Sequence, residues 1–272
     1  MGESVEAIQN NVKETLGKSG LPFLSDQPLF WRPVIQEAQA LAKKVLQDDV
    51  TDIPPRSLAP FIDHTLLKPE ATREQILKVC QEAIEFHFAA VCVNPYWVPL
   101  VREELEHTEV QVCTVIGFPL GATSAAAKVS EAELVIREGA DEIDMVLNIG
   151  ELKARNWAAV YQDIFRVVTA ALPHGVLTKV ILETALLTEE EIVAGSTIAA
   201  LAGAAFVKTS TGFSGGGATV AAVKRMADTV APYGVGVKAS GGIRSFETAV
   251  EMIKAGAIRI GASASLTIIQ VQ

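Results

Sequence analysis

The sequence has few of the residues on which metalloproteins, disulfide-bonded proteins and nucleic-acid-binding proteins depend. Only 3 of its 272 residues are cysteines, and no two of them form a CxxC pair. The 4 histidines are scattered without HxH or HExxH spacing, so we expect no metal ion. The formal charge of −9 argues against a basic surface for nucleic acid. Cys80, Cys92 and Cys113 lie in apolar segments and are expected to be buried, reduced thiols.

Other missing patterns argue against membrane proteins and two common enzyme classes. No apolar run is long enough to span a bilayer, and the first residues, MGESVEAIQN, lack the apolar core of a secretory signal. We therefore expect a cytoplasmic protein with no membrane partner. The sequence has no GxSxG elbow of a serine hydrolase and no GxGxxG motif after an early strand. We expect no cofactor.

The first 58 residues differ from the rest of the chain. Apolar residues recur there at helical spacing in residues 5–16 and again in residues 34–47. A Pro-Pro pair then breaks the pattern, and this part carries no chemical motif. We predict an N-terminal helical extension over residues 1–58, followed by the main fold over residues 59–272.

From residue 61 onward, short apolar runs alternate with amphipathic helical patterns. The predicted strands are 61–67, 89–94, 110–117, 142–148, 178–183, 206–211, 235–240 and 258–262. The clearest predicted helices are 123–138, 157–172, 189–201, 218–230 and 246–254. This alternation favours a single α/β barrel, a (β/α)8 TIM barrel, while an open doubly wound sheet is the alternative.

Several predicted strands carry a charge where an apolar residue is expected. These residues are Asp63, Asp144, Lys179, Lys208 and Lys238. An unpaired buried charge costs several kcal/mol, so such groups should be paired or should have shifted pKa values. Alternatively, some of them point outward and reach the solvent. The set as a whole favours an interior site, because active sites of such barrels lie at the carboxyl ends of the strands.

Two of these lysines, Lys208 and Lys238, lie on adjacent strands. If both point inward, burial and the like charge should make one of the two amines titrate well below the usual pKa of about 10.4. A neutral amine attacks carbonyl carbons to form an imine, and Asp144 could carry protons. The residue types alone do not decide which lysine is the nucleophile. Lys179 could belong to the same network or form a structural ion pair with Glu183.

His64 is the only histidine near the predicted site, and we expect it to be structural. The loops after the last three strands, 210–219, 239–245 and 261–265, are rich in glycine and serine. Small residues let the backbone approach an anion, and barrels often bind phosphate at these loops, where Arg244 adds positive charge. The alternative is that these glycines only make tight turns.

Several long motifs occur in order: FIDHTLLKPEAT, TVIGFPLGA, DEIDMVLNIG, KVILETALLT, FVKTSTGFSGGGAT, VKASGGIR and RIGAS. Together, from Leu58 to Ser265, they resemble the 2-deoxy-D-ribose-5-phosphate aldolase family. The resemblance implies a class I aldolase that reversibly cleaves 2-deoxy-D-ribose 5-phosphate into acetaldehyde and D-glyceraldehyde 3-phosphate through a lysine Schiff base. It also implies a homo-oligomer, a dimer or a tetramer.

Carried over by motif, Lys208 matches the Schiff-base lysine of the family and Asp144 the proton-relay acid. Lys238 matches the second lysine, which would perturb the pKa of Lys208 and assist proton transfer. Asp63 and Lys179 would support them. The positions that match the phosphate site are Gly212, Gly241, Gly242, Gly261 and Ser263. Two other readings stay open: an aldolase with a different donor or acceptor, and a non-catalytic sugar-phosphate sensor.

The end of the chain departs from the family pattern. Some members carry a C-terminal tail with a tyrosine that helps to protonate the enamine, whereas this sequence has no such tyrosine before Gln272. The eighth helix is also predicted to be short. We expect slower proton transfer, or transfer by water.

Overall fold

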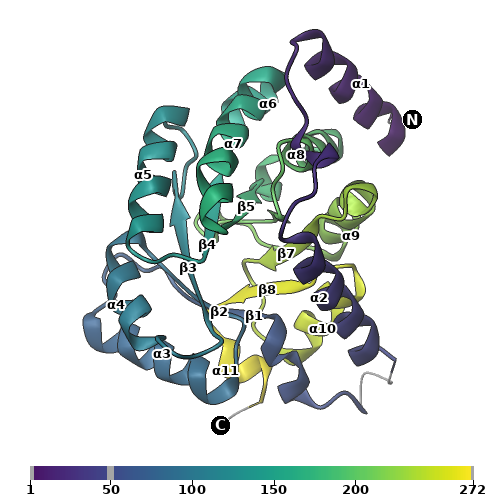
Figure 1. Cartoon of the computed structure of the whole chain (residues 1–272). Helices are drawn as coiled ribbons and strands as arrows, with labels where there is room; N and C mark the ends of the chain where they lie inside the picture. Colours follow the sequence, from purple (N-terminus) through teal and green to yellow (C-terminus); the bar gives the residue numbers. More distant parts are fainter. Residues whose placement is uncertain (1–2, 48–51, 271–272) are drawn as a thin grey trace.

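Eight parallel strands close into a barrel (Figure 1). The computed structural model describes residues 3–47 and 52–270. Strands that follow one another in the chain pair side by side, and β1 pairs with β8 to close the barrel. The strands are β1 (Ile62–Leu66), β2 (Ala90–Val93), β3 (Gln111–Ile116), β4 (Glu142–Val146), β5 (Leu177–Ile181), β6 (Phe206–Lys208), β7 (Gly236–Ser240) and β8 (Arg259–Ala262). The predicted TIM barrel is confirmed, and the open sheet is excluded.

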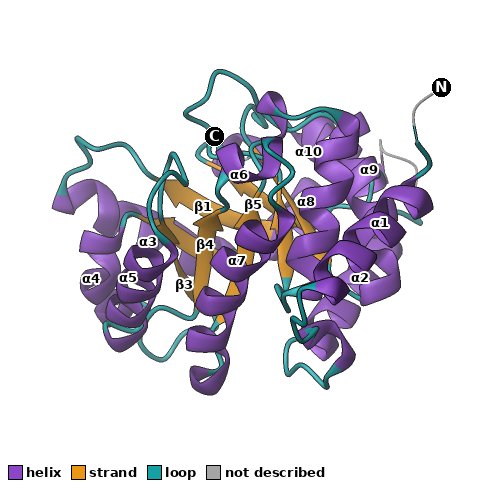
Figure 2. Cartoon of the chain, turned by 90° about the horizontal axis from the view of Figure 1, so that it is seen from above, coloured by secondary structure: helices purple, strands orange, loops and turns teal. Residues whose placement is uncertain are grey.

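Helices surround the strands (Figure 2). Those of the barrel are α3 (Arg73–Phe86), α4 (Val98–Glu104), α5 (Ala125–Arg137), α6 (Ile149–Lys153), α7 (Trp157–Ala171), α8 (Glu189–Leu201), α9 (Val220–Val230), α10 (Phe246–Lys254) and α11 (Ser265–Ile268). Short 3-10 helices are η1 (Leu24–Asp26), η3 (Pro55–Phe61), η4 (Pro95–Trp97), η5 (Leu172–His174), η6 (Thr184–Leu186) and η7 (Ala231–Tyr233). Capping boxes at Thr72 and Thr188 satisfy free N–H groups at the starts of α3 and α8. The helix after β8 is short, as predicted.

Strand β6 is shorter than the predicted span 206–211, because it ends at Lys208. The hydroxyl group of Thr209 donates to the carbonyl oxygen of Ser240 at 2.9 Å, so a side-chain hydrogen bond links the two chain segments beyond the end of β6. The chain then enters the glycine-rich β6–α9 loop (residues 209–219). This early end places Lys208 at the mouth of the barrel.

Two helices precede the barrel, α1 (Val5–Lys18) and α2 (Arg32–Val45). Helix α1 packs on α8 and α7 through the buried side chains of Ile8, Val12 and Leu16 (Figure 1). These contacts explain the helical spacing of its apolar residues. The division of the chain at residue 58 stays a prediction. Within residues 3–47 and 52–270, none of the helices combines the length and the apolar character that crossing a membrane requires.

The barrel interior has an apolar part and a charged part. The larger core includes buried side chains from both the strands and the surrounding helices. A smaller apolar cluster, formed mainly by β2 and β3, includes Cys92 and Cys113. Buried charges come from β1, β4, β5, β6, β7 and β8. A barrel interior is normally filled with branched apolar side chains, so this concentration of charge marks the site.

Candidate active site

Lys208 and Lys238 meet at one oxygen atom of Asp144. Lys208 pairs with Lys238 in the register of β6 and β7, so both side chains point into the barrel. Each Nζ lies 2.7 Å from Oδ2 of Asp144. All three side chains are buried. The structure therefore brings together the three residues that the sequence analysis selected, and none of them points outward.

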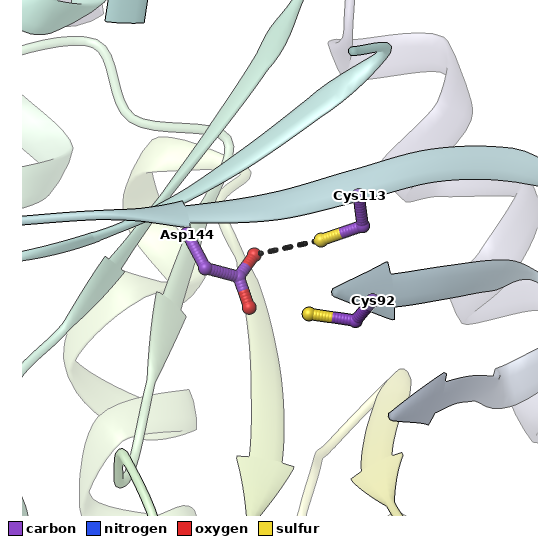
Figure 3. A group of neighbouring side chains, drawn as sticks. All are labelled: Cys92, Cys113 and Asp144. Atoms are coloured by element: carbon purple, nitrogen blue, oxygen red, sulfur yellow. Dashed lines mark hydrogen bonds between the residues drawn. The ribbon is translucent and has the colours of Figure 1, made fainter. Parts of the chain in front are cut away.

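The second oxygen of Asp144 has different partners. Its Oδ1 accepts a hydrogen bond from Nζ of Lys179 at 2.8 Å and lies 3.4 Å from Sγ of Cys113. Figure 3 shows the sulfur atoms of Cys113 and Cys92 both directed toward this carboxylate. Asp144 is thus held at both oxygens, which fixes the orientation of the carboxylate between the lysines.

Further buried charges support this cluster. Nζ of Lys179 lies 2.6 Å from Oε2 of Glu142, and Lys238 donates to Asp63. The guanidinium of Arg259 donates to Oδ1 of Asp63 at 2.8 Å and also to Glu142. Asp63 and Lys179, predicted as supporting residues, lie in this network.

Burial alone would raise the pKa of Asp144, but the nearby ammonium groups of Lys179, Lys208 and Lys238 hold it well below its usual value. Burial likewise lowers the pKa of Lys179 and Lys238, yet Asp144 and the other carboxylates raise both above the ordinary range. Lys179 and Lys238 are therefore fixed cations at neutral pH, and Asp144 is a fixed anion.

Two groups of side chains have the spacing of metal ligands. Their potential ligand atoms lie within 4.8 Å of one another in Cys92, Cys113 and Asp144, and in Asp63, Cys113 and Glu142. In the second group, Nζ of Lys179 touches all three side chains, at 3.9, 3.3 and 2.6 Å. Burial also raises the pKa of Cys113 well above its usual value, and a thiol that keeps its proton is a poor ligand. The ammonium thus occupies the centre of this group.

A cavity of about 400 Å³ opens above Lys208. It is lined by Thr65, Leu66, Leu67, Lys68, Lys208, Thr211, Gly212, Phe213, Ser240, Gly241, Gly242, Ile243, Arg244, Gly261, Ala262 and Ser263. All five predicted phosphate positions are among them. Gly241 has a φ of +86°, and a Cβ atom there would lie 2.9 Å from Cα of Gly217, so the loops approach too closely for a larger residue. The cavity thus combines small residues with the cations Lys68 and Arg244.

Two expectations about neighbouring residues have different outcomes. His64 is buried, with Nδ1 2.8 Å from Oγ of Ser265 and Nε2 2.6 Å from Oε2 of Glu82, as expected of a structural histidine. The alternative ion pair of Lys179 with Glu183 is wrong. Glu183 follows the end of β5 and accepts hydrogen bonds from the β6–α9 loop instead.

The sequence analysis missed Glu142 and Arg259. Both lie on strands, at the start of β4 and β8, and both are buried in the ion network. Like the selected residues, each is a charged residue within an apolar strand. They were not selected because they lie at the starts of their strands, whereas the active site was expected at the strand ends. Lys68 occurs in the motif FIDHTLLKPEAT but was not selected as a site residue.

Known proteins share the sequence motifs and the fold of this chain. A family model described as DeoC/LacD family aldolase matches residues 57–270. Deoxyribose-phosphate aldolase 1 of Oceanobacillus iheyensis is 55% identical over 212 residues, which are 78% of this chain and 95% of that protein. A deoxyribose-phosphate aldolase of Clostridium perfringens is 56% identical over 213 residues, 78% and 94% of the two chains. The tetrameric deoxyribose phosphate aldolase of Aeropyrum pernix superposes with a TM-score of 0.76 at 34% identity, over 86% of this chain and 96% of that one. The chain therefore belongs to the DeoC/LacD family and is an aldolase.

Proposed function

We propose that the chain reversibly cleaves 2-deoxy-D-ribose 5-phosphate into acetaldehyde and D-glyceraldehyde 3-phosphate through a Schiff base on Lys208. One observation carries the proposal: Lys208 and Lys238 share Oδ2 of Asp144 directly beneath a cavity with a glycine-rich wall. The proposed substrate also agrees with the activity in the names of relatives that are 55–56% identical.

In this mechanism, the neutral amine of Lys208 attacks the aldehyde carbon of the open-chain sugar to form a carbinolamine. The carbinolamine takes up a proton from water and loses its hydroxyl group as water, which leaves an iminium ion. Lys208 is the candidate because it lines the cavity, whereas Lys179 and Lys238 are fully buried. The fixed cations Lys179 and Lys238 keep Asp144 ionised and ready to receive a proton.

The iminium ion then withdraws electrons from the C2–C3 bond, which allows this bond to break. Asp144, through a water molecule, takes the proton of the C3 hydroxyl group. The C2–C3 bond breaks, its electron pair moves into the iminium, and glyceraldehyde 3-phosphate leaves with an enamine still bound to Lys208. A proton added at C2 of the enamine and hydrolysis of the imine release acetaldehyde. The protonated imine stabilises the developing charge.

We infer that water delivers the enamine proton. No tyrosine is among the described residues that line the cavity. Lys208 lies close to an open cavity, which gives water a route to the enamine carbon.

The phosphate group of the substrate would bind at the other end of the cavity. Gly212, Gly241, Gly242, Gly261 and Ser263 bring backbone and hydroxyl groups close to an anion. Lys68 and Arg244, which line the same cavity, would supply the positive charge that a chain of net charge −9 otherwise lacks here.

Three broader features belong to this proposal. The chain acts as a homo-oligomer in the cytoplasm, and residues 1–58 form an extension to an aldolase barrel of residues 59–272. The family match begins at residue 57, which supports this boundary. The relative from Aeropyrum pernix is a tetramer, which supports an oligomer.

Trapping of the imine tests the proposal. Incubation with acetaldehyde and borohydride should leave a stable two-carbon adduct on Lys208, detected by mass spectrometry of peptides. Lys208→Met should abolish both the adduct and cleavage of 2-deoxy-D-ribose 5-phosphate, while the exposed Lys224→Met serves as the matched control. Cleavage should persist in EDTA.

An adduct on Lys179 would contradict the assignment of the nucleophile. A wild-type chain that binds the sugar phosphate but forms no adduct would support the sugar-phosphate sensor. An adduct without cleavage of this sugar would indicate an aldolase with a different donor or acceptor.

A further inference from the structure

Glu183 is a buried carboxylate that the proposed reaction does not use. It follows β5 and is the N-cap residue of η6, in a left-handed conformation with φ of 59° and ψ of 61°. That conformation is uncommon for a residue other than glycine and persists only where the surroundings enforce it. Its side chain is fully buried, and no cation lies within 4.0 Å of it in the part of the chain that is described. The carboxylate is therefore held by neutral donors alone.

Those donors all belong to one loop. Oε2 of Glu183 accepts from the backbone N–H of Thr211 at 3.2 Å and from the hydroxyl group of Ser214 at 3.0 Å. The hydroxyl group of Thr211 donates to the same oxygen. Hydrogen bonds to a charged acceptor are about twice as strong as those between neutral groups.

The two ends of this β6–α9 loop have other anchors. Thr209 and Ser210 hydrogen-bond to Ser240, and the N–H of Ala218 donates to Ser240 and Gly241. Between these ends, and within residues 3–47 and 52–270, Glu183 is the only residue outside the loop that hydrogen-bonds to residues 211–217. The hydrogen bonding of the middle of the loop therefore depends on one side chain, while Phe213 also packs against Phe118 with the ring centroids 5.4 Å apart.

That middle segment forms the wall of the cavity. Thr211, Gly212 and Phe213 line it together with Lys208. Gly212 is one of the positions proposed to approach the phosphate group. A carboxylate this close to a bound dianion would weaken binding by repulsion if charge were its only effect. Its contribution must be geometric, because its hydrogen bonds hold the loop backbone against the substrate.

We propose that Glu183 is a positioning residue that fixes residues 211–214 and thereby determines the affinity of the site for the phosphate end of the substrate. The inference rests on the proposed function. It assigns Glu183 no contact with the reacting atoms, so its removal should affect phosphate recognition more than imine chemistry.

The test compares a phosphorylated with an unphosphorylated sugar. In Glu183→Gln, the negative charge that strengthens these hydrogen bonds is lost, and an NH2 group replaces one of the two oxygen atoms that accept from the N–H of Thr211. We expect the KM for 2-deoxy-D-ribose 5-phosphate to rise about tenfold to a hundredfold, as the loss of charge-assisted hydrogen bonds would produce. Cleavage of 2-deoxy-D-ribose and borohydride trapping of acetaldehyde on Lys208 should stay near wild type. Ser214→Ala should raise the same KM by a smaller factor, and Glu190→Gln, an exposed control paired with Arg155, should not.

A KM for the phosphorylated sugar that stays unchanged or falls in Glu183→Gln would overturn the inference. So would an equal loss on both sugars together with lost trapping, because that would assign Glu183 to the chemical centre. If Glu183→Gln does not fold, Ser214→Ala decides by the same criterion. Failure of the wild-type chain to cleave the sugar or to be trapped would overturn the proposed function instead.

Discussion

A single carboxylate oxygen, Oδ2 of Asp144, lies 2.7 Å from two lysine nitrogens. Lys238 is a fixed cation there, because Asp144 and Asp63 more than offset the effect of burial on its pKa. Its charge helps to hold the pKa of Asp144 well below the usual value. The ionised proton acceptor that the mechanism needs thus depends on a neighbour that never touches the aldehyde.

Lys238→Leu tests this dependence. We expect kcat to fall about a hundredfold or more, because Asp144 loses one of the cations that keep it ionised and in place. The rising limb of the pH profile should move to higher pH, because loss of this cation raises the pKa of Asp144, the proposed proton acceptor. Steady-state rates from pH 6 to 10 on the folded variant measure both effects. An unchanged profile would show that Lys238 does not control the ionisation of Asp144.

The sequence predicted the central residues and their partners Asp63 and Lys179, but not Glu142 and Arg259. Lys208, Lys238 and Asp144 were recognisable because a charge within an apolar strand requires compensation. Which groups compensate depends on the stagger of strands around the barrel, and this is why Arg259 reaches both Asp63 and Glu142 from β8. Sequence spacing placed Glu183 near Lys179, yet the left-handed turn after β5 directs Glu183 toward the next loop.

At the scale of elements, His64 joins β1 to α3 and α11 through Glu82 and Ser265. Burial lowers the pKa of His64 below its usual value of 6.5, although Glu82 opposes this shift. The folded protein then binds fewer protons than the unfolded chain just below that pH, so acid favours unfolding. The contribution of this side chain is complete above about pH 6.5 and declines as the pH falls toward the lowered pKa.

We therefore expect the free energy of unfolding to decrease as the pH is lowered from about 7.5 to 5.5. His64→Gln should show a smaller decrease over this range, measured by urea denaturation at each pH. The exposed His174→Gln is the control and should follow the parent protein. A parent and a His64→Gln variant with parallel pH dependence would show that His64 does not contribute to it.

At the scale of the whole molecule, the barrel and its N-terminal helices share one core. Helix periodicity predicted α1 and α2, and the alternation of strands and helices predicted the closed barrel. These sequence patterns could not predict that α1 packs on α8, because local periodicity does not specify which helix of the barrel contacts an additional helix. Helix α8 is buried along nearly its whole length, partly because α1 covers it.

Leu16→Ala measures how strongly this packing stabilises the whole chain. Leu16 is fully buried, so we expect the free energy of unfolding to fall by about 2–5 kcal/mol. Thermal or denaturant unfolding should remain a single transition. Asn11→Ala, on the exposed face of the same helix, should change stability by less than about 0.5 kcal/mol. A Leu16→Ala protein as stable as the control would indicate that α1 adds nothing to the barrel.

The ammonium of Lys179, enclosed by carboxylates and a thiol, has a consequence for protein engineering. Unlike a bound metal ion, this ammonium group is covalently part of the chain, so it cannot dissociate or be removed by a chelator. Shortening this side chain would leave the potential ligand atoms of Asp63, Cys113 and Glu142 within 4.8 Å of one another around an empty centre. A designer who wished to install an exchangeable metal ion in this barrel would start from that substitution.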